Sequence, residues 1–503
     1  MLALHDTATQ AVRRLLSEGA TEMSLYVCGP TVDNVPHLGH GRFALVFDVL
    51  RRYLEFSGLT VHHVSNITDV DDKIIARAAS EGVTEVDIAA RYEKSWWDAM
   101  DALGVLRPAE APHATDYVED MVEAVAGMLA SGSAYETSDG VYLSVDAVEG
   151  YGLLARQPLD TLRAGARVEA GGEKRSPMDF ALWKRAKPGE PVWPAPFGEG
   201  RPGWHTECVV MSLDLLGEGF DIHGGGIDLA FPHHENERAQ ASALGRPLAR
   251  HWVHNGWVTV GGEKMAKSLG NYTSLDDLLA RSDPRSYRLL VLRSHYRQPL
   301  EVTVRTTKDA AEALGRLDAL SRRFGAAGWL EGEVRQRAGV DQKAAGELGL
   351  DAAAIASFCS RMDDDLDTPA ALAGVFEVVR QAHVAGDRGE TQRGEQLAHT
   401  ADWLCAALGL RLEAGAGGAW VPVRGGAEAA GGGAHAGEVG TERGTEASTY
   451  GSGPDEEVLA LVEERDRARA ERDWSRADAL RDELAVAGWT VEDTPQGTKI
   501  RRT

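Results

Sequence analysis

Apolar and polar residues near the start of the chain follow the order strand, turn, helix, strand. The apolar stretch 24–28 is bounded by Gly29 and Pro30, which is typical of a buried strand. Apolar residues then recur at helical spacing over about 41–57, and residues 61–66 form a second strand-like stretch. This order predicts a βαβ unit of a parallel sheet.

The α/β pattern is interrupted and then resumes. Residues from about 108 to 201 mix short strand-like pieces with a Trp- and Pro-rich run, which we interpret as an insertion between two halves of the sheet. Residues 220–223 then predict a strand, Gly224, Gly225 and Gly226 a tight turn, and residues 232–243 a helix. From about 284 to 412 the periodicity is mostly helical, and residues 456–488 read as one heptad-like helix.

The pattern therefore predicts an α/β protein in four segments. A Rossmann-like parallel-sheet domain would occupy residues 1–310, split by the insertion at about 108–201 and containing the region of the lysine loop at 250–310. A helical bundle at 311–412, a flexible Gly/Ala-rich linker at 413–454 and a small C-terminal domain at 455–503 would follow. The 503 residues leave room for about three folded domains.

Composition narrows the class of protein. Hydrophobic residues make up 43% of the chain, and Lys and Arg number 53 against 77 Asp and Glu, which gives a net charge of −24. A protein that binds nucleic acid by bulk charge would be basic, so any such contact must use a local surface. The four cysteines do not form a disulfide framework, and Cys359 and Cys405 lie in apolar helical stretches of the core. Because no apolar run suits a signal peptide or a membrane span, we expect a cytoplasmic protein that does not contact membranes.

The segment between the first strand and its helix carries His37, Gly39 and His40 in the order His-Leu-Gly-His. Ligands of parallel α/β folds bind at the carboxyl ends of strands, where helix N-termini offer free N–H groups to phosphate. Two imidazoles three positions apart would add donors for the same anion, and Gly39 would let a flat base approach the backbone. The motif is short, and the alternative is a pair of polar histidines that cap a helix.

A second segment, far down the chain, follows a Gly-Gly turn and reads Lys264-Met265-Ala266-Lys267-Ser268. Two lysines separated by two residues in such a loop suit a clamp on a polyphosphate. For either lysine alone, a solvated loop is the alternative. Together and in this order, the two segments resemble the paired signatures of class I aminoacyl-tRNA synthetases.

A third group of residues, Cys28, Cys208, His233 and Glu237, has the side-chain types that bind Zn²⁺. Cys28 adjoins the first motif, and His233 and Glu237 lie four apart on a predicted helix, so both point to one face. His234 competes with His233 as a ligand but points about 100° away. The spacing is long-range, and two buried, inert cysteines are the alternative.

The chain as a whole resembles the cysteinyl-tRNA synthetase family. In that family the residues that match Cys28, Cys208, His233 and Glu237 hold the zinc ion. Besides the two signatures, the resemblance rests on these sequences: LYVCGPTV at 25–32, NITDVDDKI at 66–74, SPMDFALWK at 176–184, GRPGWHTEC at 200–208, DIHGGGIDLAFPHHENE at 221–237, DDDLDTPAAL at 363–372 and EDTPQGT at 492–498.

The resemblance implies that the chain ligates L-cysteine to tRNA(Cys) in two steps. The cysteine carboxylate attacks the α-phosphate of ATP and pyrophosphate leaves; a hydroxyl of the 3′-terminal adenosine then attacks the mixed anhydride. His37, His40, Lys264 and Lys267 would be catalytic residues that stabilise charge on the phosphates, with Mg²⁺ sharing that charge. The implied ATP-binding residues are Pro30, Thr31, Gly39, His40 and Lys267.

The resemblance also implies a purpose for the zinc. A pocket that sorts by size alone separates isosteres by only about 10–200-fold, whereas a soft metal that binds the substrate as thiolate rejects the serine hydroxyl. We therefore expect an exchangeable position on the metal and no editing domain. Thr31, Trp204 and Asp228 are implied to bind the amino acid, and core packing is the alternative for Trp204.

The C-terminal segment is the implied site of tRNA recognition. Residues 455–503 carry nine Lys and Arg against thirteen Asp and Glu, so they do not form a generic basic patch. The resemblance implies that Arg469, Trp474, Asp478 and Asp493 read an unstacked anticodon, with the indole stacking on a base. A solvated charged helix is the alternative, above all for Asp478. The family is mostly monomeric, so we expect a monomer.

Two residues depart from the family pattern, Ala266 in the lysine segment and Asp33 near the nucleotide site. Ala266 loses one hydroxyl donor, and we expect activity that is slower but retained. The nearest rival function is a ligase that joins cysteine to an amino sugar and lacks an anticodon-binding end. Two others are a short nucleotidyltransferase without the zinc residues, and a silent tRNA- or zinc-binding protein, which would lack His37, His40 or Lys267.

Overall fold

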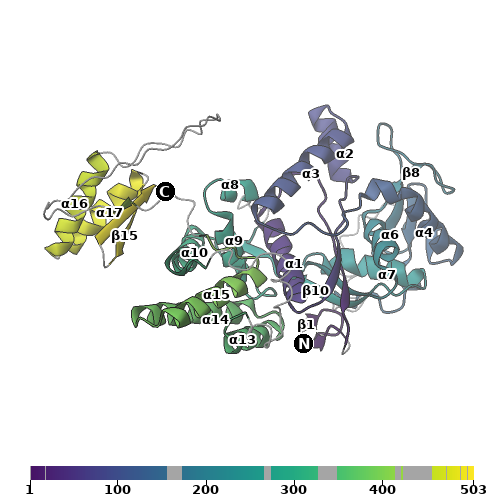
Figure 1. Ribbon diagram of the computed structural model, residues 1–503. Helices are drawn as coiled ribbons and strands as arrows, with labels where there is room; N and C mark the ends of the chain where they lie inside the picture. Colours follow the sequence, from purple (N-terminus) through teal and green to yellow (C-terminus); the bar gives the residue numbers. More distant parts are fainter. Residues whose placement is uncertain are drawn as a thin grey trace, which may run out of the picture. The chain divides into compact units, whose positions relative to one another are not determined.

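The computed structural model describes residues 2–16, 19–155, 173–265, 273–326, 348–413, 421–422, 456–471, 473–487, 489–494 and 497–502. The chain divides into two compact units, Met1–Leu412 and Glu413–Thr503. In the first unit, a parallel sheet lies between an inserted domain on one side and a group of helices on the other (Figure 1). Among the described residues, no helix combines the length and the apolar character needed to cross a membrane.

Four parallel strands form the centre of the first unit. Their order is β10 (Ala249–Asn255), β9 (Phe220–Gly226), β3 (Glu22–Val27) and β4 (Thr60–Val64), and each neighbouring pair is parallel. The chain runs from β3 to β4 on one side and later returns to β9 on the other side of β3. The strand order therefore reverses between β3 and β9, and in open parallel sheets ligands bind in the crevice that such a reversal leaves at the carboxyl ends.

The three glycines at the end of β9 do not form the predicted tight turn. They continue the strand and pair with β10. A Cβ atom on Gly224 would lie 2.3 Å from the ring of Phe47, and one on Gly225 would lie 2.8 Å from the ring of His234. The prediction was wrong because these glycines serve the close approach of neighbouring side chains rather than a change of chain direction.

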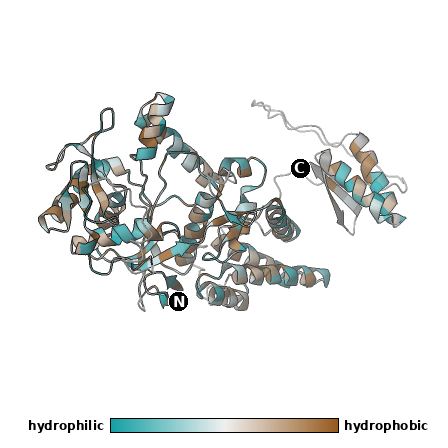
Figure 2. Cartoon of the chain, turned by 180° about the vertical axis from the view of Figure 1, so that it is seen from behind, coloured by the Kyte–Doolittle hydropathy of each residue, from teal (hydrophilic) through white to brown (hydrophobic). Residues whose placement is uncertain are grey.

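Helix α1 (Leu38–Phe56) connects β3 to β4 and confirms the predicted βαβ unit. It begins earlier than the apolar pattern predicts, because the side chain of His37 caps it by accepting a hydrogen bond from the N–H of His40. Leu45 and Phe47 are buried between α1 and its neighbours. Figure 2 shows that the helices of the molecule carry both hydrophobic and hydrophilic residues. Helix α1 is followed by β4, α2 (Asp72–Glu81) and α3 (Glu85–Ala102).

Between β4 and β9 the chain forms a second, antiparallel sheet. Its strands are β5 (Ala134–Glu136), β6 (Gly140–Leu143), β7 (Phe180–Arg185) and β8 (Gly200–Pro202), in that order across the sheet. Helix α4 (Val118–Ala130) and β7 share a core that includes Met128 and Trp183. Two short 3-10 helices, Ala114–Tyr117 and Val145–Ala147, complete this part, and α6 (Trp204–Leu216) leads from it to β9.

The segment after β9 returns to the sheet through a π-helical turn, Ala230–His234, and α7 (Glu235–Ala243), before β10. A small sheet follows, in which β11 (Val258–Val260) pairs with β12 (Glu263–Lys264) and with β13 (Leu300–Glu301). Between β12 and β13 lie α8 (Leu275–Leu279) and α9 (Pro284–Leu292). A hairpin of β1 (Ala3–Asp6) and β2 (Ala11–Arg14) opens the chain.

Four longer helices account for most of the remaining described residues of the first unit, 304–326 and 348–412. They are α10 (Val304–Phe324), α13 (Ala352–Met362), α14 (Thr368–Asp387) and α15 (Thr391–Ala407). Their shared core is continuous with that of α1 and α9. Cys359 and Cys405 are buried there, as predicted.

The described residues of the second unit form two helices and a small antiparallel sheet. The single long helix predicted here was wrong: α16 (Glu456–Ala470) ends, and α17 (Trp474–Val486) begins anew. Asp473 caps α17 by accepting a hydrogen bond from the N–H of Arg476, a local bond that competes with a continuous helix. Strands β15 (Trp489–Thr494) and β16 (Gly497–Arg502) form a hairpin that β14 (Val421–Pro422) extends.

Candidate active site and metal centre

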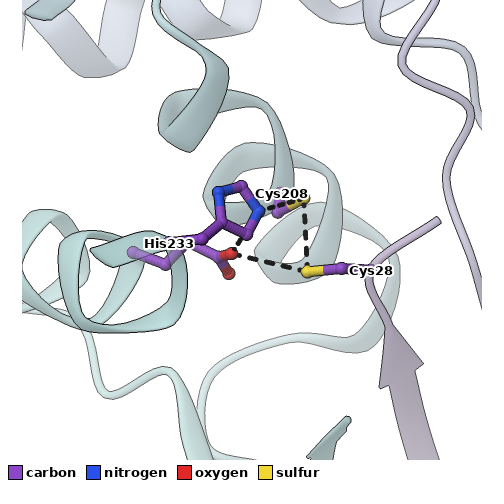
Figure 3. A group of neighbouring side chains, drawn as sticks. Cys28, Cys208 and His233 are labelled. Atoms are coloured by element: carbon purple, nitrogen blue, oxygen red, sulfur yellow. Dashed lines mark hydrogen bonds and ion pairs between the residues drawn. The ribbon is translucent and has the colours of Figure 1, made fainter. Parts of the chain in front are cut away.

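Four side chains converge where β3 ends. Cys28 follows β3 directly, Cys208 projects from α6, His233 lies in the π-helical turn Ala230–His234, and Glu237 lies in the first turn of α7. Their donor atoms all lie within 4.8 Å of one another, and all four residues are buried. Figure 3 shows the two thiols and the imidazole of His233 turned toward one another. These are the four residues predicted as metal ligands.

Three separations between donor atoms suit a tetrahedral ion, and a fourth, 2.9 Å between Nε2 of His233 and Oε1 of Glu237, is shorter because these two groups form an ion pair. The Sγ atoms of Cys28 and Cys208 are 3.6 Å apart, Cys208 Sγ is 3.7 Å from Nε2 of His233, and Cys28 Sγ is 3.4 Å from Oε1 of Glu237. Donors at about 2.0–2.3 Å from a tetrahedral zinc ion are about 3.3–3.8 Å from each other. Two sulfurs, an imidazole nitrogen and a carboxylate oxygen are also donor types that zinc accepts. The residues therefore fit Zn²⁺ in both geometry and chemistry.

The local backbone explains how His233 and Glu237 reach the same point. The π-helical turn contains the non-helical residue Phe231 and passes directly into α7, so residues four apart share a face. Oε1 of Glu237 lies 2.9 Å from Nε2 of His233. His234 also reaches the group from its own direction, with Nε2 3.3 Å from Sγ of Cys28, while its Nδ1 lies 2.9 Å from Nε2 of His254 on β10.

The electrostatics of the group favour a bound cation. The hydrogen bond from Cys28 lowers the pKa of Cys208 to about 6, while burial raises the pKa of Cys28 well above its ordinary value. Burial would lower the pKa of His233, but the carboxylate of Glu237 outweighs it and raises that pKa to about 10. Burial would raise the pKa of Glu237, but His223 and His233 hold it well below its usual range. A thiolate and a carboxylate are thus kept ionised in a buried place, where a metal ion would compensate their charge.

Sequence reasoning missed the histidines that surround these ligands. Nε2 of His223 lies 2.6 Å from Oε2 of Glu237, and Nδ1 of His205 lies 2.8 Å from Nδ1 of His233. Such outer partners orient metal ligands and set the tautomer of a ligating imidazole. His223, His234, Cys28 and Glu237 even form a second, overlapping group of donors. His223 ends the predicted strand, and that position next to Gly224 was the one signal that could have drawn attention to it.

Of the three residues predicted to bind the amino acid, Trp204 contacts the metal centre, whereas Thr31 and Asp228 show no contact with it among the described residues. The ring of Trp204 is half-buried and stacks on the imidazole of His233, with 4.0 Å between ring centroids. Pro30 and Thr31 follow Cys28, and the backbone of this segment pairs with Thr68. Asp228 is exposed just beyond β9. The indole of Trp204 therefore packs directly against one of the predicted metal ligands, His233.

The first signature motif forms the N-terminus of α1. The rings of His37 and His40 stack with 3.7 Å between their centroids, and both side chains are half-buried. His37 and His40 each accept a hydrogen bond from the backbone N–H of the other, so they do cap the helix as the alternative reading held. The N-terminus of α1 lies at the carboxyl end of β3, which is where parallel α/β folds bind anions.

The second signature segment starts and ends beside the first. Met265 lies 3.9 Å from the position that a Cβ atom on Gly39 would take. On the other side of the segment, the N–H of Leu38 donates to the carbonyl oxygen of Thr273 at 3.4 Å, and Ser274 pairs with His37. Lys264 is exposed on β12. Ala266 and Lys267 lie outside the described residues.

The predicted tRNA-binding residues all belong to the second unit. Trp474 opens α17 with 59% of its side chain exposed, and Asp478 lies one turn later on the same helix and is also exposed. Arg469 lies in the last turn of α16 and is half-buried. Asp493 belongs to β15, and its side chain is outside the described residues.

Comparison with protein families covers most of the chain. Residues 16–312 match the catalytic domain of tRNA synthetases of class I (C), and residues 357–413 match the DALR domain. Residues 452–501 match the anticodon binding domain of cysteinyl-tRNA ligase.

Curated relatives match from end to end. A cysteine–tRNA ligase of Carboxydothermus hydrogenoformans is 38% identical over 502 residues, covering 100% of both chains, and one of Solidesulfovibrio magneticus is 42% identical over 504 residues, covering 99% of both. Among solved structures, the methionyl-tRNA synthetase of Mycobacterium tuberculosis in complex with methionyl-adenylate shares the fold. Its TM-score is 0.56 at 16% identity, covering 77% of this chain and 89% of that one. The chain therefore belongs to the cysteine–tRNA ligase family of class I tRNA synthetases.

Proposed function

We propose that this chain ligates L-cysteine to tRNA(Cys) with ATP, through cysteinyl-adenylate and then transfer to the 3′-terminal adenosine. The observation that carries the proposal is that the Cys28, Cys208, His233 and Glu237 group and the N-terminus of α1 lie at the same reversal of strand order. A thiol-selective centre and an anion-binding helix end thus share one crevice.

The chain's own residues would do the following work in the first step. The N-terminus of α1, with His37 and His40, would stabilise negative charge on the phosphates of ATP, and Lys264 and Lys267 with Mg²⁺ would stabilise the leaving pyrophosphate. Positioning and electrostatics are sufficient, since the cysteine carboxylate itself attacks the α-phosphate. In the second step, a hydroxyl of the terminal adenosine attacks the resulting mixed anhydride and AMP leaves.

Selection of cysteine over serine would come from the metal centre. The four donors would hold Zn²⁺, which supplies a soft Lewis acid that favours a thiolate over a hydroxyl. Trp204 would close the pocket beside His233 and exclude water, while the outer histidines keep the ligands oriented. Size alone would separate the two amino acids by only about 10–200-fold.

The test is charging of tRNA with labelled cysteine, beside labelled serine and beside a sample treated with a zinc chelator. We expect cysteine to be charged, serine to be rejected by more than the limit for size alone, and charging to fail without zinc and return when zinc is restored. Serine charging that matches cysteine charging would overturn the metal-based selection.

The same assay addresses the rival ligase that uses an amino sugar. If cysteine drives exchange of pyrophosphate into ATP but no tRNA is charged, the result would favour the ligase that joins cysteine to an amino sugar. The match of residues 452–501 to an anticodon-binding domain supports tRNA as the acceptor.

A further inference from the structure

Arg42 lies on α1 just beyond the first signature motif, and its side chain is fully buried. Its guanidinium donates to the carbonyl oxygens of Trp257, at 2.6 Å, and Tyr296, at 3.1 Å, and also to that of Gln298. Among the described residues, every acceptor of Arg42 is a backbone carbonyl. One buried cation therefore ties the helix of the first signature to the segment that leads into β11.

The backbone at residue 257 is held in place from two sides. A Cβ atom on Gly256 would lie 2.6 Å from the carbonyl oxygen of Gln298, so this segment packs directly on its neighbour. The carbonyl oxygen of Trp257 also accepts the N–H of Leu300, at 3.0 Å. The indole of Trp257, in contrast, is 42% exposed and stands at the rim of the small sheet.

The exposed indole has a specific partner. Nζ of Lys264 lies over the ring of Trp257, 4.9 Å from the ring centroid. Lys264 pairs with Thr259 across the β11–β12 hairpin, and side chains two positions apart on a strand share a face, so Trp257 and Lys264 are on the same face. The side chain of the next residue, Met265, instead approaches Gly39 of the first signature.

We propose that Trp257 is a positioning residue for Lys264. Its indole holds the ammonium group of Lys264 by a cation–π contact, and Arg42 anchors the backbone of residue 257 to the first signature helix. The inference rests on the proposed function, because it concerns where the first lysine of the second signature stands when ATP binds. A cation–π contact at an exposed site shifts an equilibrium by about two- to fivefold. Arg42 donates to the backbone carbonyl of residue 257, and this carbonyl is present whatever side chain stands there. Variants of the Trp257 side chain therefore test the role of the ring alone.

The experiment measures cysteine-dependent exchange of pyrophosphate into ATP for the full chain. The variants are Trp257→Leu, Trp257→Phe, Lys264→Met and the double variant Trp257→Leu/Lys264→Met. We expect Trp257→Leu to raise the KM for ATP about two- to fivefold with the KM for cysteine unchanged, and Trp257→Phe to restore most of the loss. In the Lys264→Met background, Trp257→Leu should have no further effect. Trp97→Leu is the matched control, because it removes another ring–cation contact, that with Arg107, and should not change the KM for ATP.

Three results would overturn the inference: equal effects of Trp257→Leu with and without Lys264, a Phe variant no better than Leu, or an equal rise in the KM for cysteine. Failure of the unmodified chain to catalyse any exchange would instead refute the proposed function, and the inference with it. The two failures are thus distinguishable in one set of assays.

Discussion

Glu237 is the residue on which the charge balance of the metal centre depends. Its buried carboxylate contacts His233 through one oxygen, at 2.9 Å, and His223 through the other, at 2.6 Å. The His233 contact follows from helical spacing, whereas the His223 contact joins α7 to β9. A carboxylate held at both oxygens is fixed in orientation, and outer partners of this kind strengthen metal binding.

His223→Gln should therefore weaken metal retention although His223 is outside the four predicted ligands. We expect the zinc affinity to fall about 10–100-fold, measured by competition with a chromogenic chelator. His251→Gln is the control, because His251 is a buried histidine of the adjacent strand whose ring, within the described part of the chain, bonds to the backbone carbonyls of Asp221 and Arg14 and not to a metal ligand. An equal loss in both variants would assign the effect to general loosening of the sheet.

At the scale of elements, a buried ion pair joins α1 to α9. Asp48 on α1 contacts Arg288 on α9 at 2.5 Å and Arg52 at 2.8 Å, and both Asp48 and Arg288 are fully buried. Arg288 also donates to the carbonyl oxygen of Leu408, just beyond α15. The helix that carries the first signature is therefore fastened to the helical part of the first unit.

Asp48→Asn should destabilise the fold by about 3–5 kcal/mol, because it leaves Arg288 as an uncompensated buried charge. Equilibrium unfolding in urea measures the loss. Asp98→Asn, which breaks the exposed pair with Lys94, should cost less than about 1 kcal/mol. Similar losses in the two variants would contradict the assignment.

The same pair predicts a pH dependence. Burial would raise the pKa of Asp48, but Arg288 and Arg52 outweigh it and hold that pKa below its ordinary value. A carboxyl group whose pKa is lower in the folded chain than in the unfolded chain stabilises the fold at pH values above its unfolded pKa of about 3.9. This stabilisation is lost as the pH falls through the pKa of the folded chain. The stability difference between the unmodified chain and Asp48→Asn should be constant near pH 7 and shrink below about pH 4. A stability difference that grows as the pH is lowered would contradict a lowered pKa of Asp48.

At the scale of the whole molecule, the two units divide the proposed work. All the residues assigned to adenylate formation lie in Met1–Leu412, while Trp474 and Asp478 lie in Glu413–Thr503. With a net charge of −24, the chain must meet RNA through specific local contacts. An exposed indole at the start of α17 is suited to stack on an unpaired base.

Trp474→Ala in the full chain should raise the KM for tRNA about 5–150-fold, the equivalent of about 1–3 kcal/mol of base stacking. Cysteine-dependent pyrophosphate exchange, which needs no tRNA, should keep its rate. A chain that ends at Leu412 should likewise retain exchange and charge tRNA less efficiently than Trp474→Ala. Loss of exchange in the point variant would show that the second unit supports the catalytic site itself.

Much of the fold followed from patterns within short stretches of chain. The βαβ order of β3, α1 and β4 comes from backbone periodicity, and the shared face of His233 and Glu237 comes from helical spacing. Local patterns failed where a residue serves a distant neighbour. Gly224 reads as a turn residue but makes room for Phe47, and the apolar repeat across residues 456–486 gave no sign of the cap at Asp473.

The sequence by itself determined the residue types of the site, the motifs at the two signatures and the family to which they point, because these are properties of neighbours along the chain. Only the tertiary structure decided which distant groups meet. His223 against Glu237 and Arg42 against the carbonyl of Trp257 depend on the order of strands in the sheet and on the packing of α1. Such contacts join residues with no shared periodicity, and their free energy exists only once the intervening chain has folded.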